Sequence, residues 1–178
     1  MAKRKLKSSL SNPIYYTTLK TKTPLGLIGI AGSEKGLLKI VFKLAHESQF
    51  KSDLIDSYSN KCQKNPTFFD AVAEQLNLYF AGELKKFTCK LDLSQGTPFQ
   101  QKVWRKLTTI PYGKTRSYRT LAEAIGHPRA FRATGNANGK NPLPLIIPCH
   151  RVIRENGGLG GYSCGLPIKR FLLDLESV

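Results

Sequence analysis

The hydrophobic and polar positions change their spacing along the chain, which separates a strand-rich first half from a helix-rich second half. The β-branched and aromatic run 14–19 predicts a strand. The apolar segments 25–31 and 37–42 flank a loop with glycine at both ends, which is typical of a β-hairpin. Residues 67–84 repeat apolar positions every three to four residues, so they predict a helix with Gly82 as its stop.

The other segments of the first half have weaker patterns. Residues 43–64 are polar and predict a connection that contains a short helix. Residues 87–93 alternate between apolar and polar, which is typical of a half-buried strand. A Ser-Gln-Gly sequence at 94–96 indicates a linker. We therefore expect a small α/β domain, preceded by a basic tail, over residues 1–94.

The second half opens with a strong helix signal. Thr97 predicts the N-cap, Pro98 the first turn, and Gln100 completes a capping box. Ser117 predicts the cap of a second helix over 118–125.

A glycine-containing turn follows at residues 126–128, and a third helix is expected from Pro128 through Asn138. Two short helices joined by such a turn are typical of a helix-turn-helix. A last helix is predicted over 167–175. The whole chain is therefore expected to be α+β, with a second, helical domain over residues 97–178.

The third helix has unusually small side chains. Ala130, Ala133 and Ala137 are expected along one side, and Gly135 lies within, where glycine costs about 1 kcal/mol relative to alanine. Close packing on the protein core would explain this composition. Close packing into a nucleic-acid groove would explain it together with the charges.

The chain is strongly basic, with a formal net charge of +16. Residues 99–154 contain 11 Lys and Arg residues and one acidic residue, Glu123. Such a distribution favours binding to the phosphate backbone of nucleic acid through counterion release. The basic N-terminal tail is either a solvated segment or a nucleic-acid arm.

The composition also limits the cellular setting. The basic N-terminus lacks the apolar region of a secretory signal, so we do not expect a secreted protein. No run approaches the roughly 18 apolar residues of a membrane span, and no membrane association is expected. The four cysteines lack C-x-x-C spacing, so the sequence indicates free thiols in a reducing compartment and no metal site.

A thiol, an imidazole and a guanidinium lie side by side in the apolar segment 145–153, as Cys149, His150 and Arg151. Pro148 favours an extended chain at this point, in which neighbouring side chains point to opposite faces. A bridging water or a turn would then be needed to couple Cys149 to His150. The segment contains either a buried structural cysteine beside a satisfied histidine or a reactive thiol.

Two C-terminal features have alternative interpretations. The glycine-rich loop 156–165 lacks the spacing of a phosphate-binding loop, and we interpret it as a wall beside the Cys149 segment. Glu176 is either an ordinary terminal charge or a carboxylate that folds back to orient His150.

Together these motifs resemble the O6-alkylguanine-DNA alkyltransferase family over the whole second half, whereas the first half resembles it only in layout. The motifs that carry the resemblance are Ile147-Pro148-Cys149-His150-Arg151-Val152, Asn141-Pro142, Thr97-Pro98-Phe99-Gln100 with Trp104, Ser117-Tyr118, Arg132-Ala133-Thr134-Gly135, Gly161-Tyr162-Ser163 and Leu172–Glu176.

The resemblance implies an RNase H-like first domain, a winged-helix-like second domain and a single-turnover DNA repair reaction. Cys149 would accept an alkyl group from O6 of a flipped-out guanine, and from O4 of thymine as well. His150 would act as a base through a water and be oriented by Glu176. Tyr118 would donate a proton to the leaving guanine, and Asn141 would lock the turn of the active segment.

The resemblance also implies the binding surfaces. Arg132 would insert into the duplex where the base leaves. The other implied DNA-binding residues are Tyr118, Arg119, Ala130, Ala133, Thr134, Gly135, Asn138 and Arg151. The implied pocket residues are Pro144, Tyr162, Ser163, Cys164 and Lys169. The expected partner is double-stranded DNA carrying O6-alkylguanine, bound by a monomer without cofactor or metal, in a prokaryotic cytoplasm or a eukaryotic nucleus.

One residue departs from the family pattern. The family commonly has two glycines after Tyr-Ser, whereas this chain has Cys164 in the first of these positions. We expect this side chain to narrow the pocket for bulky adducts. Two other functions fit parts of the sequence: a small Cys–His hydrolase, and a non-catalytic binder of alkylated DNA with the same fold.

Overall fold

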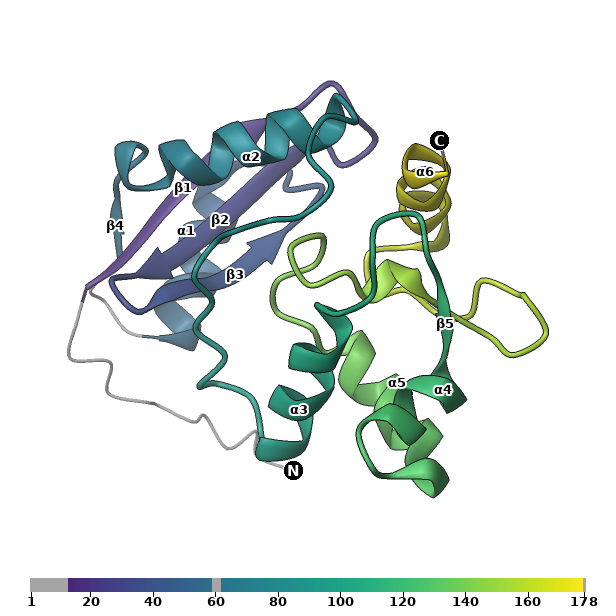
Figure 1. The fold of residues 1–178 in the computed structure, drawn as a ribbon. Helices are drawn as coiled ribbons and strands as arrows, with labels where there is room; N and C mark the ends of the chain where they lie inside the picture. The colour runs from purple at the N-terminus through teal and green to yellow at the C-terminus, as the bar shows by residue number, and fades with distance from the viewer. Residues whose placement is uncertain (1–12, 59–61, 178) are drawn as a thin grey trace. The chain divides into compact units, whose positions relative to one another are not determined.

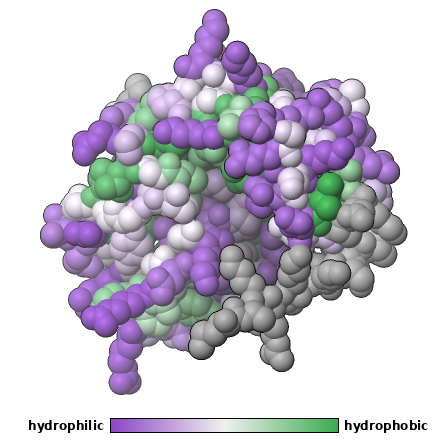
Figure 2. All heavy atoms as spheres, turned by 180° about the vertical axis from the view of Figure 1, so that it is seen from behind, coloured by the Kyte–Doolittle hydropathy of each residue, from purple (hydrophilic) through white to green (hydrophobic). Residues whose placement is uncertain are grey.

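The computed structural model describes residues 13–58 and 62–177. The basic N-terminal tail, for which the sequence suggested two roles, lies outside the described residues. None of the helices in the described segments is long and apolar enough to cross a membrane. Hydrophilic residues predominate on the face drawn in Figure 2, with hydrophobic ones scattered among them.

The described residues form two compact units. The first unit contains the described residues up to Glu74 together with Cys89–Gln95. The second contains Gln75–Thr88 and the chain from Gly96 onward. The division after Gln95 falls within the segment interpreted as a linker, whereas no local pattern predicted that Gln75–Thr88 belongs to the second unit.

The first unit is built on a four-stranded sheet with the strand order β3-β2-β1-β4 (Figure 1). The predicted strand and hairpin are confirmed as β1 (Ile14–Lys20), β2 (Leu27–Ser33) and β3 (Gly36–Val41), which pair antiparallel. The short strand β4 (Cys62–Lys64) lies parallel to β1 at the other edge.

Helix α1 (Glu47–Ser57) is the short helix expected in the polar connection, and it covers one face of this sheet. Its buried Phe50 and Leu54 belong to a core with Ile14 and Tyr16 of β1. Gly29 allows this close packing, because a Cβ there would lie 2.7 Å from the ring of Phe50.

The expected strand over residues 87–93 is wrong. This segment makes only an isolated bridge between Leu91 and Leu37, with hydrogen bonds from Leu37 N to Lys90 O and from Asp92 N to Leu37 O, both 2.8 Å. Because both bonds involve the same residue of β3, the ladder does not extend along the edge. The predicted helix over 67–84 is a 3₁₀ turn, Thr67–Phe69, followed by α2 (Asp70–Phe80), and Gly82 has a φ of +78° just beyond its end.

After the linker, the second unit continues with α3 (Pro98–Leu107), and the predicted capping box of this helix is present. The Thr97 hydroxyl accepts from Gln100 N at 3.2 Å, while Thr97 N donates to the Gln100 side chain at 2.8 Å. The buried Trp104 of this helix donates from Nε1 to the carbonyl of Ala137 at 2.9 Å. This bond fixes α3 against the later helix that contains Ala137.

The predicted helix-turn-helix is confirmed. Ser117 caps α4 (Tyr118–Ala124), and Gly126 takes a φ of +76° in the turn. The third helix differs slightly from the prediction, because a 3₁₀ turn, Pro128–Ala130, precedes α5 (Phe131–Gly139).

Two short parallel strands, β5 (Arg116–Ser117) and β6 (Val152–Ile153), connect this motif to the Cys149 segment. The chain ends with α6 (Leu166–Glu176).

Thr97→Ala should destabilise the second unit by about 1 kcal/mol, because Gln100 N loses its acceptor at the start of α3. Urea denaturation followed by circular dichroism measures this difference. Thr108→Ala is the matched control at the exposed C-terminal end, where the hydroxyl donates to Arg105 O within the same helix; it should change stability by less than about 0.5 kcal/mol. Equal losses from the two variants would contradict a specific capping effect.

A candidate active site around Cys149

Cys149 lies in a 3₁₀ turn, Cys149–Arg151, and is almost fully buried. The expectation of an extended chain at this point is wrong. Arg151 N donates to Pro148 O at 3.0 Å and closes the turn. Asn138 donates from Nδ2 to the carbonyl of Cys149 at 3.3 Å. The turn therefore places the thiol and the following two side chains by backbone geometry rather than by strand alternation.

Asn141 holds the chain that leads into this turn. Its Nδ2 donates to Ile147 O at 2.8 Å, and its Oδ1 accepts from Leu143 N at 3.0 Å. Between these two residues, Leu145 adopts a φ of +81°, which is unfavourable for a branched side chain. The two hydrogen bonds of the buried Asn141 side chain hold this loop and offset the strain.

Burial makes the Cys149 thiol difficult to ionise. Desolvation raises its pKa to about 11, although a hydrogen bond from the Asn141 side chain works in the opposite direction. At neutral pH the sulfur is therefore a protonated thiol, and a reaction at this sulfur needs a base.

His150 is fully buried, and it contacts Glu176. Its Nε2 lies 2.8 Å from Oε1 of Glu176, and because a carboxylate can only accept, Nε2 carries the hydrogen. Burial lowers the pKa of His150 despite the neighbouring carboxylate. Nδ1 has no hydrogen-bond partner among the described residues. The imidazole therefore presents a buried, unprotonated nitrogen, the atom that a general base requires.

Glu176 accepts from four further groups. Arg151 donates from Nε to Oε2 at 2.8 Å and from Nη2 to Oε1 at 2.9 Å. Tyr79 donates to Oε1 at 2.5 Å, and Gly113 N donates to Oε2 at 3.3 Å. Burial alone would raise the pKa of Glu176, but the hydrogen bonds from His150 and Arg151 outweigh it and lower the pKa to about 2.

This arrangement corrects the assignment of Arg151 to the DNA-binding surface. The residue is 6% exposed, and its remaining Nη1 donates to Ile110 O at 2.6 Å. Every nitrogen of the guanidinium thus has an acceptor inside the protein. Arg151 forms an ion pair with Glu176, because a buried carboxylate needs a charged partner.

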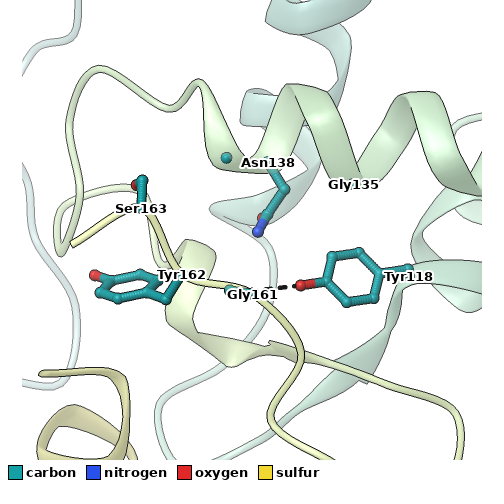
Figure 3. A pocket seen from close by; sticks show the side chains of 7 residues that line it. Tyr118, Gly135, Asn138, Gly161, Tyr162 and Ser163 are labelled. Atoms are coloured by element: carbon teal, nitrogen blue, oxygen red, sulfur yellow. Dashed lines mark hydrogen bonds between the residues drawn. The ribbon is translucent and has the colours of Figure 1, made fainter. Parts of the chain in front are cut away.

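A pocket of about 170 Å³ lies next to Asn138 (Figure 3), whose Nδ2 donates to the carbonyl of Cys149. It is lined by Tyr118, Gly135, Asn138, Gly139, Gly161, Tyr162 and Ser163. The Tyr118 hydroxyl donates to Gly161 O at 3.4 Å, as the dashed line marks. The glycine-rich loop passes close to this ring, since a Cβ on Gly160 would lie 2.9 Å from the hydroxyl oxygen.

The pocket contains some predicted residues and omits others. Tyr118, Tyr162 and Ser163 line it, whereas Pro144, Cys164 and Lys169 are not part of its lining. Lys169 is fully buried, and its ammonium donates to the carbonyls of Val152, Leu159 and Gly161.

Lys169 therefore holds the glycine-rich loop by its backbone carbonyls instead of lining the pocket. Burial lowers its pKa to about 8. Cys164 is half-buried, with its sulfur 3.9 Å from Ser163 Oγ, directly beside the lining.

Helix α5 does not present all of its predicted DNA-binding residues. Thr134 and Asn138 are buried, so their assignment to the DNA-binding surface is corrected. Ala137 also faces inward, so the three alanines do not share one side. Arg132 and Ala133 are exposed. The inward side of the helix, formed by Thr134, Ala137 and Asn138, packs against α3.

The exposed side of the helix-turn-helix is basic and carries one large apolar residue. Phe131 is 41% exposed, and the guanidinium groups of Arg119 and Arg132 lie 5.8 and 6.0 Å from its ring centre. Ala130 is partly exposed beside it. Gly135 faces the pocket, where an added Cβ would lie 3.5 Å from the Tyr118 ring. Its missing side chain therefore leaves room in the pocket.

The sequence did not reveal the role of Tyr79. It appeared only as one apolar position of a predicted helix, yet its hydroxyl reaches Glu176 across 97 residues of sequence. Within the described residues, no group of three or more His, Cys, Asp or Glu side chains is arranged to hold a metal.

Comparison with known families covers both halves of the chain. Residues 98–178 match the family model described as 6-O-methylguanine DNA methyltransferase, DNA binding domain. Residues 14–93 match that described as 6-O-methylguanine DNA methyltransferase, ribonuclease-like domain. Together the two models span most of the 178 residues.

Individual relatives are similar over nearly the whole length. A methylated-DNA–protein-cysteine methyltransferase of Methanosarcina barkeri is 46% identical over 164 residues, covering 92% of this chain and 97% of the relative. A protein of the same name from Mycobacterium bovis is 56% identical over 112 residues, covering 63% of this chain and 67% of that one. The crystal structure of Mycobacterium tuberculosis OGT in complex with DNA has a TM-score of 0.78 and 44% identity, covering 92% of each chain.

The Glu176 network should make stability depend on acid pH. The pKa of Glu176 is lowered from 4.5 to about 2, so its stabilisation is present above about pH 4.5 and is lost as the pH falls toward 2. When the pH falls from 6 to 3, the free energy of unfolding of the wild type should therefore decrease by on the order of 1–2 kcal/mol more than that of Glu176→Gln. Urea unfolding at both pH values measures the two losses. Identical losses would show that the carboxylate is not stabilised in its charged form.

Proposed function

This chain belongs to the 6-O-methylguanine DNA methyltransferase family, and on that premise we propose that it repairs DNA by moving the methyl group of O6-methylguanine to its own Cys149. The observation that carries the proposal is the turn Cys149–Arg151, which places a buried thiol next to a histidine paired with a buried carboxylate. Such a constellation is suited to activating a sulfur nucleophile.

The reaction begins with ionisation of the thiol. His150 takes the proton of Cys149 through a bridging water, using Nδ1, while Nε2 stays bonded to Glu176. The ionised carboxylate stabilises the imidazolium that forms. The sulfur then attacks the methyl carbon, the S–C bond forms, and the C–O6 bond breaks.

The guanine leaves as an anion and accepts a proton. Tyr118, whose hydroxyl reaches the pocket, supplies or relays that proton to the ring. The product is a thioether at Cys149, which has no leaving group that this chain can displace. Each molecule therefore acts once, and the protein is consumed in stoichiometric amounts.

The target base has to leave the stack before it can react. Extrusion costs a few kcal/mol, and an enclosing pocket offsets part of that free energy. We assign this role to the pocket of Figure 3, in which Tyr118, Tyr162 and Ser163 surround an open space. The same pocket would admit O4-methylthymine, and the side chain of Cys164 beside it would disfavour bulky adducts.

The helix-turn-helix provides the DNA-binding surface. Arg132 and Arg119, with Ala130 and Ala133, form a surface of small and basic residues that suits the minor groove. Arg132 fills the gap that the flipped base leaves. As a DNA repair protein it would act as a monomer in the cytoplasm of a prokaryote or the nucleus of a eukaryote.

Incubation with duplex DNA containing O6-methylguanine should add one methyl group, about 14 Da, to the wild type and none to Cys149→Ser. Intact mass spectrometry measures this addition. Cys164→Ser is the matched control, since it removes the neighbouring thiol and should retain the addition. Repeated turnover on an ester or amide would instead indicate a Cys–His hydrolase, and tight binding without any mass change would indicate a non-catalytic binder.

Arg132→Ala should slow methyl transfer from duplex DNA by about tenfold or more, because the extruded base loses the group that replaces it in the stack. Transfer from the free base O6-methylguanine should stay near the wild-type rate, since no duplex is opened. Single-turnover kinetics with both substrates measure how much the substitution slows transfer from duplex DNA relative to transfer from the free base. Arg170→Ala, an exposed arginine on α6, is the control; equal slowing with both substrates would exclude an intercalating role for Arg132.

A further inference from the structure

We infer that Tyr79 is a positioning residue of the methyl-transfer site, which holds the charge of Glu176 so that His150 remains a neutral base. The inference rests on the proposed function, because it concerns the base of that reaction. It is carried by the bond from the Tyr79 hydroxyl to Oε1 of Glu176, the same oxygen that accepts from His150.

Three donors share this one oxygen. The Tyr79 hydroxyl lies 2.5 Å from Oε1, His150 Nε2 lies at 2.8 Å and Arg151 Nη2 at 2.9 Å. Each donor withdraws electron density from the oxygen and leaves less for the others. The strength with which Glu176 stabilises a positive imidazole therefore depends on how much of its charge Tyr79 already takes up.

The position of Tyr79 is fixed by its surroundings. The side chain is 0% exposed and belongs, with residues Gln75–Thr88, to the same compact unit as Glu176. Its ring centre lies 5.2 Å from that of Phe87, 5.7 Å from Phe80 and 6.0 Å from Tyr112. This aromatic packing leaves the hydroxyl little freedom to move away from the carboxylate.

Tyr79 acts as a permanent donor. Burial and the adjacent Glu176 both raise its pKa, so the hydroxyl stays protonated at neutral and moderately alkaline pH. A tyrosine in this position can therefore tune the carboxylate without titrating itself.

Several other groups act on the His150–Glu176 pair. Arg151 in the Cys149 turn and Lys169 on α6 both oppose protonation of His150. Burial and the nearby Glu176 raise the pKa of the Tyr112 phenol, but the Tyr112 hydroxyl donates to the Leu175 carbonyl at 3.0 Å and not to the carboxylate. Tyr112 is thus the natural comparison for Tyr79, with the same side chain near the same helix end.

The sign of the effect follows from the shared oxygen. Without the Tyr79 hydroxyl, Oε1 of Glu176 accepts one hydrogen bond fewer. The carboxylate then stabilises the protonated imidazole of His150 more strongly. The pKa of His150 then rises toward neutrality. Because only neutral His150 can accept the thiol proton, the acidic limb of the rate profile moves to higher pH.

The experiment compares Tyr79→Phe, Tyr112→Phe and the wild type. Single-turnover methyl transfer from O6-methylguanine duplex DNA is measured from pH 5 to pH 9, with thermal melting of each protein as a check on folding. In parallel, nitrogen NMR of histidine-labelled protein follows the tautomer and titration of His150, one of only three histidines in the chain.

We expect Tyr79→Phe to move the acidic limb and the His150 titration upward together by about 0.5 pH unit or more, a factor of about three in the protonation equilibrium. Tyr112→Phe should leave both at their wild-type positions. A lower rate at every pH with unmoved titration, or equal behaviour of the two variants, would overturn the inference. Wild-type protein that transfers no methyl group would instead refute the proposed function itself.

Discussion

The charged carboxylate of Glu176 is the constraint on which the rest of the site depends. It is buried at the end of the last helix, and burial of an unpaired carboxylate would cost several kcal/mol. Arg151, Tyr79, Gly113 N and His150 together satisfy its two oxygens. This single side chain thereby links α2, the segment before β5, the Cys149 turn and α6. In the proposed reaction the chemistry uses the same bonds, since the carboxylate that holds these segments together also selects the tautomer of His150.

The pocket depends on backbone packing more than on polar contacts. Gly160 brings the loop against the ring of Tyr118, and Gly135 lies on the other side of that ring. Lys169 anchors this loop to β6 by donating to two loop carbonyls, of Leu159 and Gly161, and to that of Val152. A buried lysine in such a cage replaces the regular hydrogen bonding that a glycine-rich loop lacks. The loop can therefore contain many glycines and still form a defined wall.

Local signals in the sequence predicted most helices and strands, because capping and periodicity depend on near neighbours. Thr97 and Gln100 identified the start of α3, and Ser117 and Gly126 delimited the first helix of the helix-turn-helix. The failures have a common physical origin. The expected strand at 87–93 pairs with β3 only around Leu37, and the Cys149 segment, expected to be extended, is a turn that the side chains of Asn138 and Asn141 hold in place. Arg151, Thr134 and Asn138 were placed on the surface because exposure depends on the packing of α5 and α6, which no local pattern contains.

By itself, the sequence determined which chemical groups are present. The thiol and the imidazole are given by residue identity, and the basic helix-turn-helix is predicted by local patterns. Only the tertiary structure decided how these groups work. It placed Arg151 against Glu176 instead of against DNA, brought Tyr79 from a distant helix to the same carboxylate, and left Nδ1 of His150 without a partner in the described residues. The reason is that the free energy of a buried charge depends on all the groups around it, and in this protein those groups come from segments up to 97 residues apart.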